Sequence, residues 1–155
     1  MSSGQERPPY EAYAAIAVSF GGLLAAVGAV GRLLDRDPQC QTSLDFGILA
    51  LASFKAARTL ARDPVTAPVR APFLEGEADS EDEQPVRDGG LQQAIGELVT
   101  CTRCVGTWAA AGLASTQIVA PRFGRLLTWS LGAAAANDFL QAGFTALTGK
   151  ANELN

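Results

Sequence analysis

Two cysteines three positions apart, Cys101 and Cys104, are the residues whose type and spacing most directly suggest chemistry. A C-x-x-C pair can bind a metal ion or cycle between a dithiol and a disulfide. A structural zinc site needs four ligands and the chain has no histidine, so carboxylates, Cys40 or a second subunit would have to complete it. We therefore expect no bound metal and no cofactor.

Reversible oxidation of the pair is a second interpretation. A thiolate at Cys101 would be stabilised by the start of the helix that follows and by the positive charge of Arg103. Palmitoylation of a membrane-proximal cysteine is another alternative. The interpretation that we favour is structural: Cys101 and Cys104 are small, polarisable residues packed where an interfacial helix turns into a membrane-spanning one.

Asp138 is the other residue whose position suggests a special role. It lies midway along an otherwise apolar stretch, residues 126–149, where inserting an unpaired carboxylate into a bilayer costs about 2.5 to 3.5 kcal/mol. Lys55 is the candidate partner, because the helix rise places both residues inside the same end of their helices. A protonated Asp138 that hydrogen-bonds a neighbouring helix is the alternative. An ion-conducting or transporting oligomer that uses Asp138 is the corresponding functional hypothesis.

Composition limits the class of protein. A chain of 155 residues forms one domain of ordinary size, and its net charge of −4 disfavours nucleic acid as a partner. The polar residues are concentrated, since seven of the sixteen acids lie in the run from Glu75 to Asp88. The rest of the chain is correspondingly apolar. No nucleophile–base pair or phosphate-binding glycine loop can be identified, so we do not expect an enzyme.

Four long apolar segments lie outside the acidic run. The sequence predicts an all-α integral membrane bundle in one domain, 1–155, with about four transmembrane helices and a short interfacial helix. The predicted spans are residues 13–31, 44–62, 104–121 and 126–149, the interfacial helix is 91–100, and residues 63–90 form a proline-rich and acidic cytoplasmic loop. We expect the prolines of that loop to keep residues 64–73 extended, and the acidic run to be a solvated, mobile connection.

Charge bias orients these spans. If all four cross, eight basic residues lie on the side of the termini and four on the other side. Arginine outnumbers lysine ten to two, which fits a GC-rich bacterial genome. The positive-inside rule then predicts a multi-pass protein of a bacterial cytoplasmic membrane with both termini cytoplasmic. The partners that we expect are the lipid bilayer, a second copy through small-residue stripes such as Gly106–Ala110–Ala114, and a basic protein for the acidic loop.

Three stretches resemble a known family. Residues 58–73 (RTLARDPVTAPVRAPF), 94–113 (AIGELVTCTRCVGTWAAAGL) and 137–141 (NDFLQ) are similar to the bacterial membrane-protein family catalogued as domain of unknown function 1360. Thr102 and Arg103 stand where that family usually has a proline and an aromatic residue, which disfavours a strict redox role. The resemblance implies a small integral membrane protein that is sporulation-associated in some relatives.

Lys55, Arg58 and Arg62 share one helical face at the end of the second predicted span, where their long side chains can reach a membrane interface. The further candidates for a functional or structural role are Arg58, Arg62, Asp63 and Arg70. Together the observations predict a structural or accessory membrane component that associates with itself. The alternatives are a thiol-dependent redox or metal-sensing protein using Cys101 and Cys104, and the transporter using Asp138.

Overall fold

The chain is mostly helical, and its computed structural model describes residues 8–36, 41–76, 83–87 and 90–153. The described part contains the helices α1 (Tyr10–Leu33), α2 (Ser43–Arg62), α3 (Ala67–Arg70), α4 (Leu91–Thr100), α5 (Thr102–Val119) and α6 (Pro121–Glu153). Two 3₁₀ turns, η1 (Pro64–Thr66) and η2 (Ala71–Phe73), flank α3, and the two-residue strands β1 (Leu74–Glu75) and β2 (Gln84–Pro85) pair antiparallel. The predicted all-α fold class is confirmed. Cys40, and residues 77–82 and Asp88 of the acidic run, lie outside the described residues.

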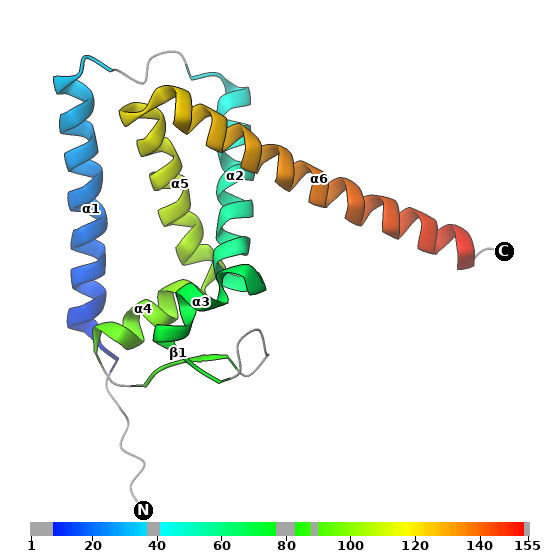
Figure 1. Cartoon of the computed structure of the whole chain (residues 1–155), viewed down its shortest axis with the longest axis horizontal. Coiled ribbons are helices and arrows are strands. Elements are labelled where there is room, and N and C mark those ends of the chain that lie inside the picture. The colour runs from blue at the N-terminus through cyan, green and yellow to red at the C-terminus, as the bar shows by residue number, and fades with distance from the viewer. Residues whose placement is uncertain (1–7, 37–40, 77–82, 88–89, 154–155) are drawn as a thin grey trace, which may run out of the picture.

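The long helices form an open bundle in which α2 is central. Helices α1, α2 and α5 run alongside one another, and α4 closes one end of the bundle together with α3 and the small hairpin (Figure 1). Helix α6 begins at the opposite end, packs across α2 and α5, and then leaves the bundle (Figure 1). Helix α1 contacts the rest through α5 and α4.

Local chemistry sets both ends of α2. The Thr42 hydroxyl accepts a hydrogen bond from the Asp45 backbone N–H at 3.2 Å, and the Asp45 carboxylate accepts one from the Thr42 N–H at 3.0 Å. This reciprocal capping box satisfies two N–H groups that the first turn leaves unpaired. The helix ends at Arg62 because Asp63 precedes Pro64 and adopts extended angles.

The proline-rich segment is not extended, so that prediction was wrong. Residues 64–73 form three consecutive short helical turns instead. Pro64, Pro68 and Pro72 each occupy the first or second position of one turn. The missing N–H of proline costs nothing there, since these positions lack an intrahelical acceptor in any case.

The corner between α5 and α6 is tight. Helix α6 begins at Pro121, again at the position that proline tolerates best, rather than near the start of the predicted span 126–149. Gly124 allows the close approach, because a Cβ atom there would lie 2.5 Å from the backbone carbon of Thr116. The two helices therefore pack against each other directly after the turn.

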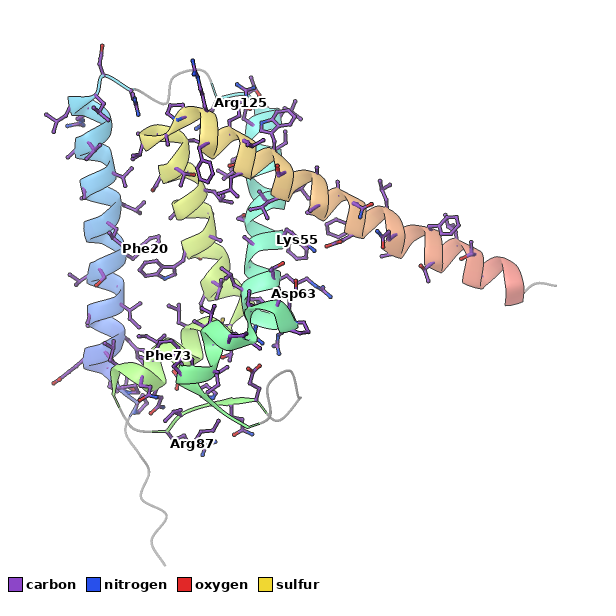
Figure 2. The ribbon with its side chains drawn as sticks, viewed as in Figure 1. Phe20, Lys55, Asp63, Phe73, Arg87 and Arg125 are labelled. Carbon is purple, nitrogen blue, oxygen red and sulfur yellow. The ribbon has the colours of Figure 1, made fainter. Side chains whose placement is uncertain are left out.

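The helices meet through small side chains, and most large apolar side chains point outward. Ala52 and Ala135 are fully buried, and Ala57 and Ala61 are nearly so. The side chains that face outward include those of Val18, Leu23, Phe46, Phe123, Leu140 and Phe144. Figure 2 shows such side chains projecting from the helices into the surroundings. This distribution is the reverse of the one in a water-soluble core.

In the described part of the chain, α1 is the helix that is both long and apolar enough to cross a membrane. It lies near the N-terminus, and 6% of its most apolar window is buried against the rest of the chain. Basic residues in α2 and the pair Asn137–Asp138 in α6 lower the apolar character of those helices. The structure therefore supports membrane association through α1, whereas the predicted count of four spans is not confirmed.

Candidate functional site

The cysteine pair forms the junction between α4 and α5. Cys101 is the residue before α5, and its sulfur accepts a hydrogen bond from the Cys104 backbone N–H at 3.4 Å. The Cys104 thiol lies 2.8 Å from the Cys101 sulfur, and both cysteines are free. Cys101 thus acts as the N-cap of α5, which is the position that serine or aspartate commonly holds.

This geometry favours the thiolate of Cys101. The hydrogen bond from the Cys104 thiol is the largest cause that lowers the pKa of Cys101, and the Cys104 backbone N–H and the Arg103 charge act in the same direction. Cys104 is exposed, whereas Cys101 is half-buried. In the described part of the chain, no group of three or more Cys, Asp or Glu side chains comes close enough to hold a metal ion.

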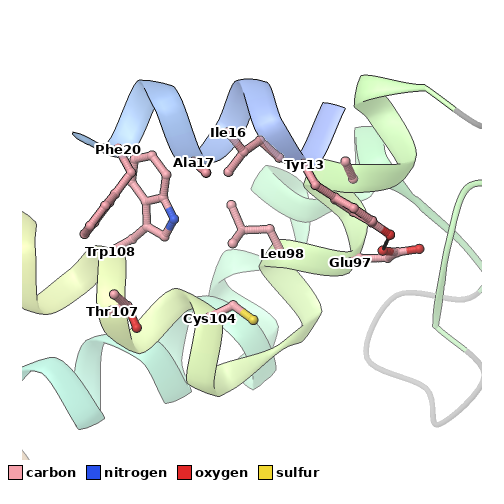
Figure 3. Close-up of a pocket in the computed structure, with 10 residues that line it drawn as sticks. Tyr13, Ile16, Ala17, Phe20, Glu97, Leu98, Cys104, Thr107 and Trp108 are labelled. Carbon is pink, nitrogen blue, oxygen red and sulfur yellow. Dashed lines mark hydrogen bonds between the residues drawn. The ribbon is translucent and has the colours of Figure 1, made fainter. Parts of the chain in front are cut away.

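A cavity of about 400 Å³ adjoins this junction between α1, α4 and α5. Its lining residues are Tyr13, Ile16, Ala17, Phe20, Ala94, Glu97, Leu98, Cys104, Thr107 and Trp108 (Figure 3). The lining is mainly apolar. The rings of Phe20 and Trp108 meet edge to face with centroids 4.9 Å apart, so this aromatic contact joins α1 to α5.

Glu97 supplies a polar end to the cavity, and the sequence analysis did not single it out. The Tyr13 hydroxyl donates a hydrogen bond to one Glu97 oxygen (Figure 3). The Gln93 side-chain amide donates to the other Glu97 oxygen at 2.9 Å. The sequence did mark this position, since Glu97 is the one charged residue among residues 91–100. Its role is to tie α4 to the start of α1.

Lys55 and Asp138 are brought together by the crossing of α2 and α6. The Lys55 Nζ atom donates to Asp138 Oδ2 at 2.7 Å, and the two side chains keep 23% and 43% of their surface exposed. Lys55 lies on α2 between the point where α6 crosses it and Asp63 (Figure 2). The rings of Phe54 and Phe139 stack one residue away on each helix, with centroids 5.6 Å apart. The ion pair therefore sits beside an aromatic contact at the helix crossing.

Arg70 is a buried structural residue that closes the end of α2. It is 2% exposed, and its Nη1 atom donates to the carbonyl oxygens of Leu60 and Asp63 at 3.1 and 3.0 Å. Its Nη2 atom pairs with Glu83 at 3.3 Å. Arg70 thus satisfies carbonyl groups that the end of a helix leaves without partners. Asp63 contributes its backbone carbonyl oxygen to this contact. Glu83 was hidden from sequence reasoning because it belongs to a run of acids that looks uniformly solvated.

Arg58 and Arg62 lie apart from both cysteines and from the ion pair. Both are exposed on the last turns of α2, and they line a second cavity, of about 690 Å³, with Thr102 and Arg103 at the start of α5. The candidate residues are therefore distributed over three places: the cysteine junction, the crossing of α2 with α6, and the end of α2.

The lowered pKa of Cys101 predicts the pH dependence of its alkylation. In a Cys40→Ser background, Cys101 should reach half its maximal rate with iodoacetamide below the ordinary thiol value of about 8.5, because only the thiolate reacts. Cys104→Ala removes the donor thiol and should move this midpoint upward. Cys104→Ser keeps an O–H donor and should move it less. A midpoint that is unchanged or lower in Cys104→Ala would contradict the assigned cause.

The contact between Lys55 and Asp138 predicts coupled effects on stability. Asp138→Leu alone should lower the free energy of unfolding of the purified protein, because it leaves the Lys55 ammonium without its partner. Asp138→Asn should be milder. Adding Lys55→Met to Asp138→Leu should restore much of the loss, with a coupling energy of about 0.5 to 3 kcal/mol in denaturant titrations followed by circular dichroism. Strictly additive effects would show that the pair contributes nothing.

Known proteins resemble this chain over the part that contains these residues. The family model described as "Protein of unknown function (DUF1360)" matches residues 48–144. Sporulation protein YjcA of Bacillus subtilis (strain 168) is 33% identical over 81 residues, which cover 48% of this chain and 69% of YjcA. No solved structure matches the chain. Since the family match runs from α2 into the outer half of α6 and includes the cysteine pair, Lys55 and Asp138, the chain belongs to the DUF1360 family.

Proposed function

We propose that this protein is a structural or accessory component of a bacterial cytoplasmic membrane, which it crosses four times through α1, α2, α5 and α6. The observation that carries the proposal is the reversed distribution of side chains. Val18, Phe46 and Leu140 expose 75%, 73% and 72% of their surface, while the buried contacts between helices are made largely by alanines. Close contact through small residues, with large apolar side chains toward lipid, is the pattern of helices packed within a bilayer.

The energetic argument is simple. Burying a large apolar side chain is worth about 1.5 to 3 kcal/mol, and twenty-two large hydrophobic residues are exposed in the described part of the chain. A water-soluble protein could not leave so much apolar surface in contact with water. Eighteen of these residues lie on α1, α2, α5 and α6, so a bilayer around these helices would remove most of this surface from water without any change in the fold.

The length of α6 is sufficient for this placement. A helix of 33 residues is about 50 Å long, whereas the hydrocarbon core of a bilayer is about 30 Å thick. A helix longer than the bilayer accommodates the mismatch by tilting. Helix α6 runs obliquely to α1, α2 and α5 (Figure 1).

Orientation follows from the basic residues. Under this proposal the ends of α2 and α4 lie on the cytoplasmic side, together with both termini and the acidic run, and that side carries eight of the twelve basic residues. Arg125 lies at the opposite end of the bundle from Asp63 and Arg87 (Figure 2). The corner between α5 and α6 would then face outward.

Self-association is the second part of the proposal, and the outer half of α6 is the surface that we assign to it. Residues 141–150 are all exposed, and the apolar side chains of Phe144 and Leu147 are 70% and 73% exposed. The small-residue stripes have less surface to offer a second copy, because Gly132 packs against Ile48 and Gly106 lies near Ala57 within the same chain. A second copy laid against α6 would cover its outer half.

Two other functions have less support. Asp138 forms an ion pair with Lys55, so a transport role would first require that this ion pair break. Thiol redox chemistry is the second candidate, and the 2.8 Å distance between the Cys101 and Cys104 sulfurs favours it. The name of the Bacillus subtilis relative supports a setting in sporulation for either function.

Membrane placement predicts which cysteines can be labelled from outside. The protein should remain in the membrane pellet after an alkaline wash of bacterial membranes. In intact cells, a membrane-impermeant maleimide should label Cys40 and miss Cys101 and Cys104, which should become accessible after permeabilisation. Labelling of the pair in intact cells would overturn the orientation. Recovery of the protein in the soluble fraction would overturn the membrane placement itself.

The assignment of α6 predicts which apolar residues assembly requires. In mild detergent, native mass spectrometry should show oligomers that are lost in the double variant Phe144→Ala with Leu147→Ala. The matched control is Phe46→Ala with Leu44→Ala on α2, which removes one residue of each type at comparable exposure and should leave assembly intact.

The double variant Cys101→Ser with Cys104→Ser should also assemble as the wild type does. A monomeric wild type, or equal losses in the α2 and α6 variants, would contradict self-association through α6. Loss of assembly in the serine variant alone would favour the thiol-dependent function.

A further inference from the structure

Three arginines from two helices line one cavity at the end of the bundle that carries Arg70. Arg58 and Arg62 lie one turn apart on α2, and Arg103 lies in the first turn of α5. All three line the cavity of about 690 Å³ between these helices, together with Thr102. Residues more than 40 positions apart in the chain thus contribute positive charge to the same space.

These charges have no counter-charge within the described part of the chain. The two ion pairs found there are Lys55–Asp138 and Arg70–Glu83, and neither involves the three arginines. No acidic residue is among those that line the cavity. Helix α5 begins at Thr102, so the positive end of its dipole adds to the field. Like charges gathered in this way repel one another unless an anion binds between them.

The other wall of the cavity is mainly apolar; its one polar side chain, Ser53, donates its hydroxyl to the Ala50 carbonyl oxygen of the same helix. Ala50, Phe54 and Ala57 lie on the side of α2 that leads away from the arginines, and Gly106 continues this surface on α5. The distance along α2 from Arg58 to Ala50 is about 12 Å by helix rise. Phe54 is 46% exposed. An inorganic anion would use the arginines alone, whereas an amphiphile would use both walls.

We infer that this cavity binds an anionic phospholipid, with its phosphate held by Arg58, Arg62 and Arg103 and the start of an acyl chain laid along Phe54 and Ala50. Guanidinium groups suit this ligand because each can donate two parallel hydrogen bonds to phosphate oxygens. The Thr102 hydroxyl is a further donor on the same wall. The inference rests on the proposed membrane placement, which puts these arginines at the cytoplasmic leaflet, where anionic lipids give a negative surface.

The test compares lipid retention in a mild detergent by native mass spectrometry. Wild-type protein is titrated with phosphatidylglycerol or phosphatidylcholine of the same acyl chains, and it should retain the anionic lipid preferentially. The triple variant Arg58→Gln, Arg62→Gln and Arg103→Gln should lose at least about tenfold in apparent affinity for phosphatidylglycerol, because several basic contacts are removed together.

The matched control is Arg32→Gln, Arg122→Gln and Arg125→Gln, which removes the same charge at the other end of the bundle and should keep the preference. Millimolar inorganic phosphate or glycerol 3-phosphate should not displace the bound lipid. Complete displacement by inorganic phosphate would show that the site takes free phosphate instead.

Two failures are distinguishable. A wild-type protein that stays in the membrane pellet but retains both lipids equally, or a triple variant that keeps the preference, would overturn the lipid site and leave the membrane placement intact. A protein recovered in the soluble fraction would overturn both. The triple variant should itself stay in the membrane pellet, since none of its three side chains makes a described hydrogen bond or ion pair within the chain.

Discussion

The close approach of α2 to α5 and α6 is the constraint on which the rest of this structure depends. Ala57 and Ala61 on α2 form a small cluster with Val105 on α5. On the other side of α2, a Cβ atom at Gly132 would lie 2.9 Å from the Ile48 side chain, so α6 can pass at this distance only with glycine there. Small side chains let helix backbones approach closely, and the contacts are then made by dispersion forces.

Each polar feature follows from that approach. The crossing of α2 with α6 places Lys55 against Asp138, and the contact of α2 with α5 places Arg58 and Arg62 beside Arg103. Neither the ion pair nor the arginine cluster is complete on one helix alone. The same geometry separates the two kinds of charge: opposite charges meet at the helix crossing, and like charges gather at the end of the bundle. The first arrangement is neutral and structural, whereas the second lacks a counter-ion within the described residues.

The connection after α2 shows how local rules can be correct and still mislead. Proline does interrupt a long helix, and α2 does end before Pro64. The segment nevertheless folds into successive helical turns, because every proline falls where its missing N–H is not needed. Arg70 then closes the end of α2 from within this segment, with Glu83 as its partner. That pairing joins residues 13 positions apart, and no periodic pattern in the sequence signals it.

The sequence by itself determined the all-α fold class, the family resemblance, the cysteine junction before a helix and the pairing hypothesis for Lys55. Each rests on information that is local or additive: apolar runs, helix rise, capping residues and charge. Tertiary structure decided the rest. The contacts of Glu97 with Tyr13 and of Arg70 with Glu83 depend on how helices rotate about their axes and cross, and so does the cavity that Arg103 shares with the end of α2. Helices joined through alanine and glycine have few large side chains to specify that rotation, so the packed backbones decide it.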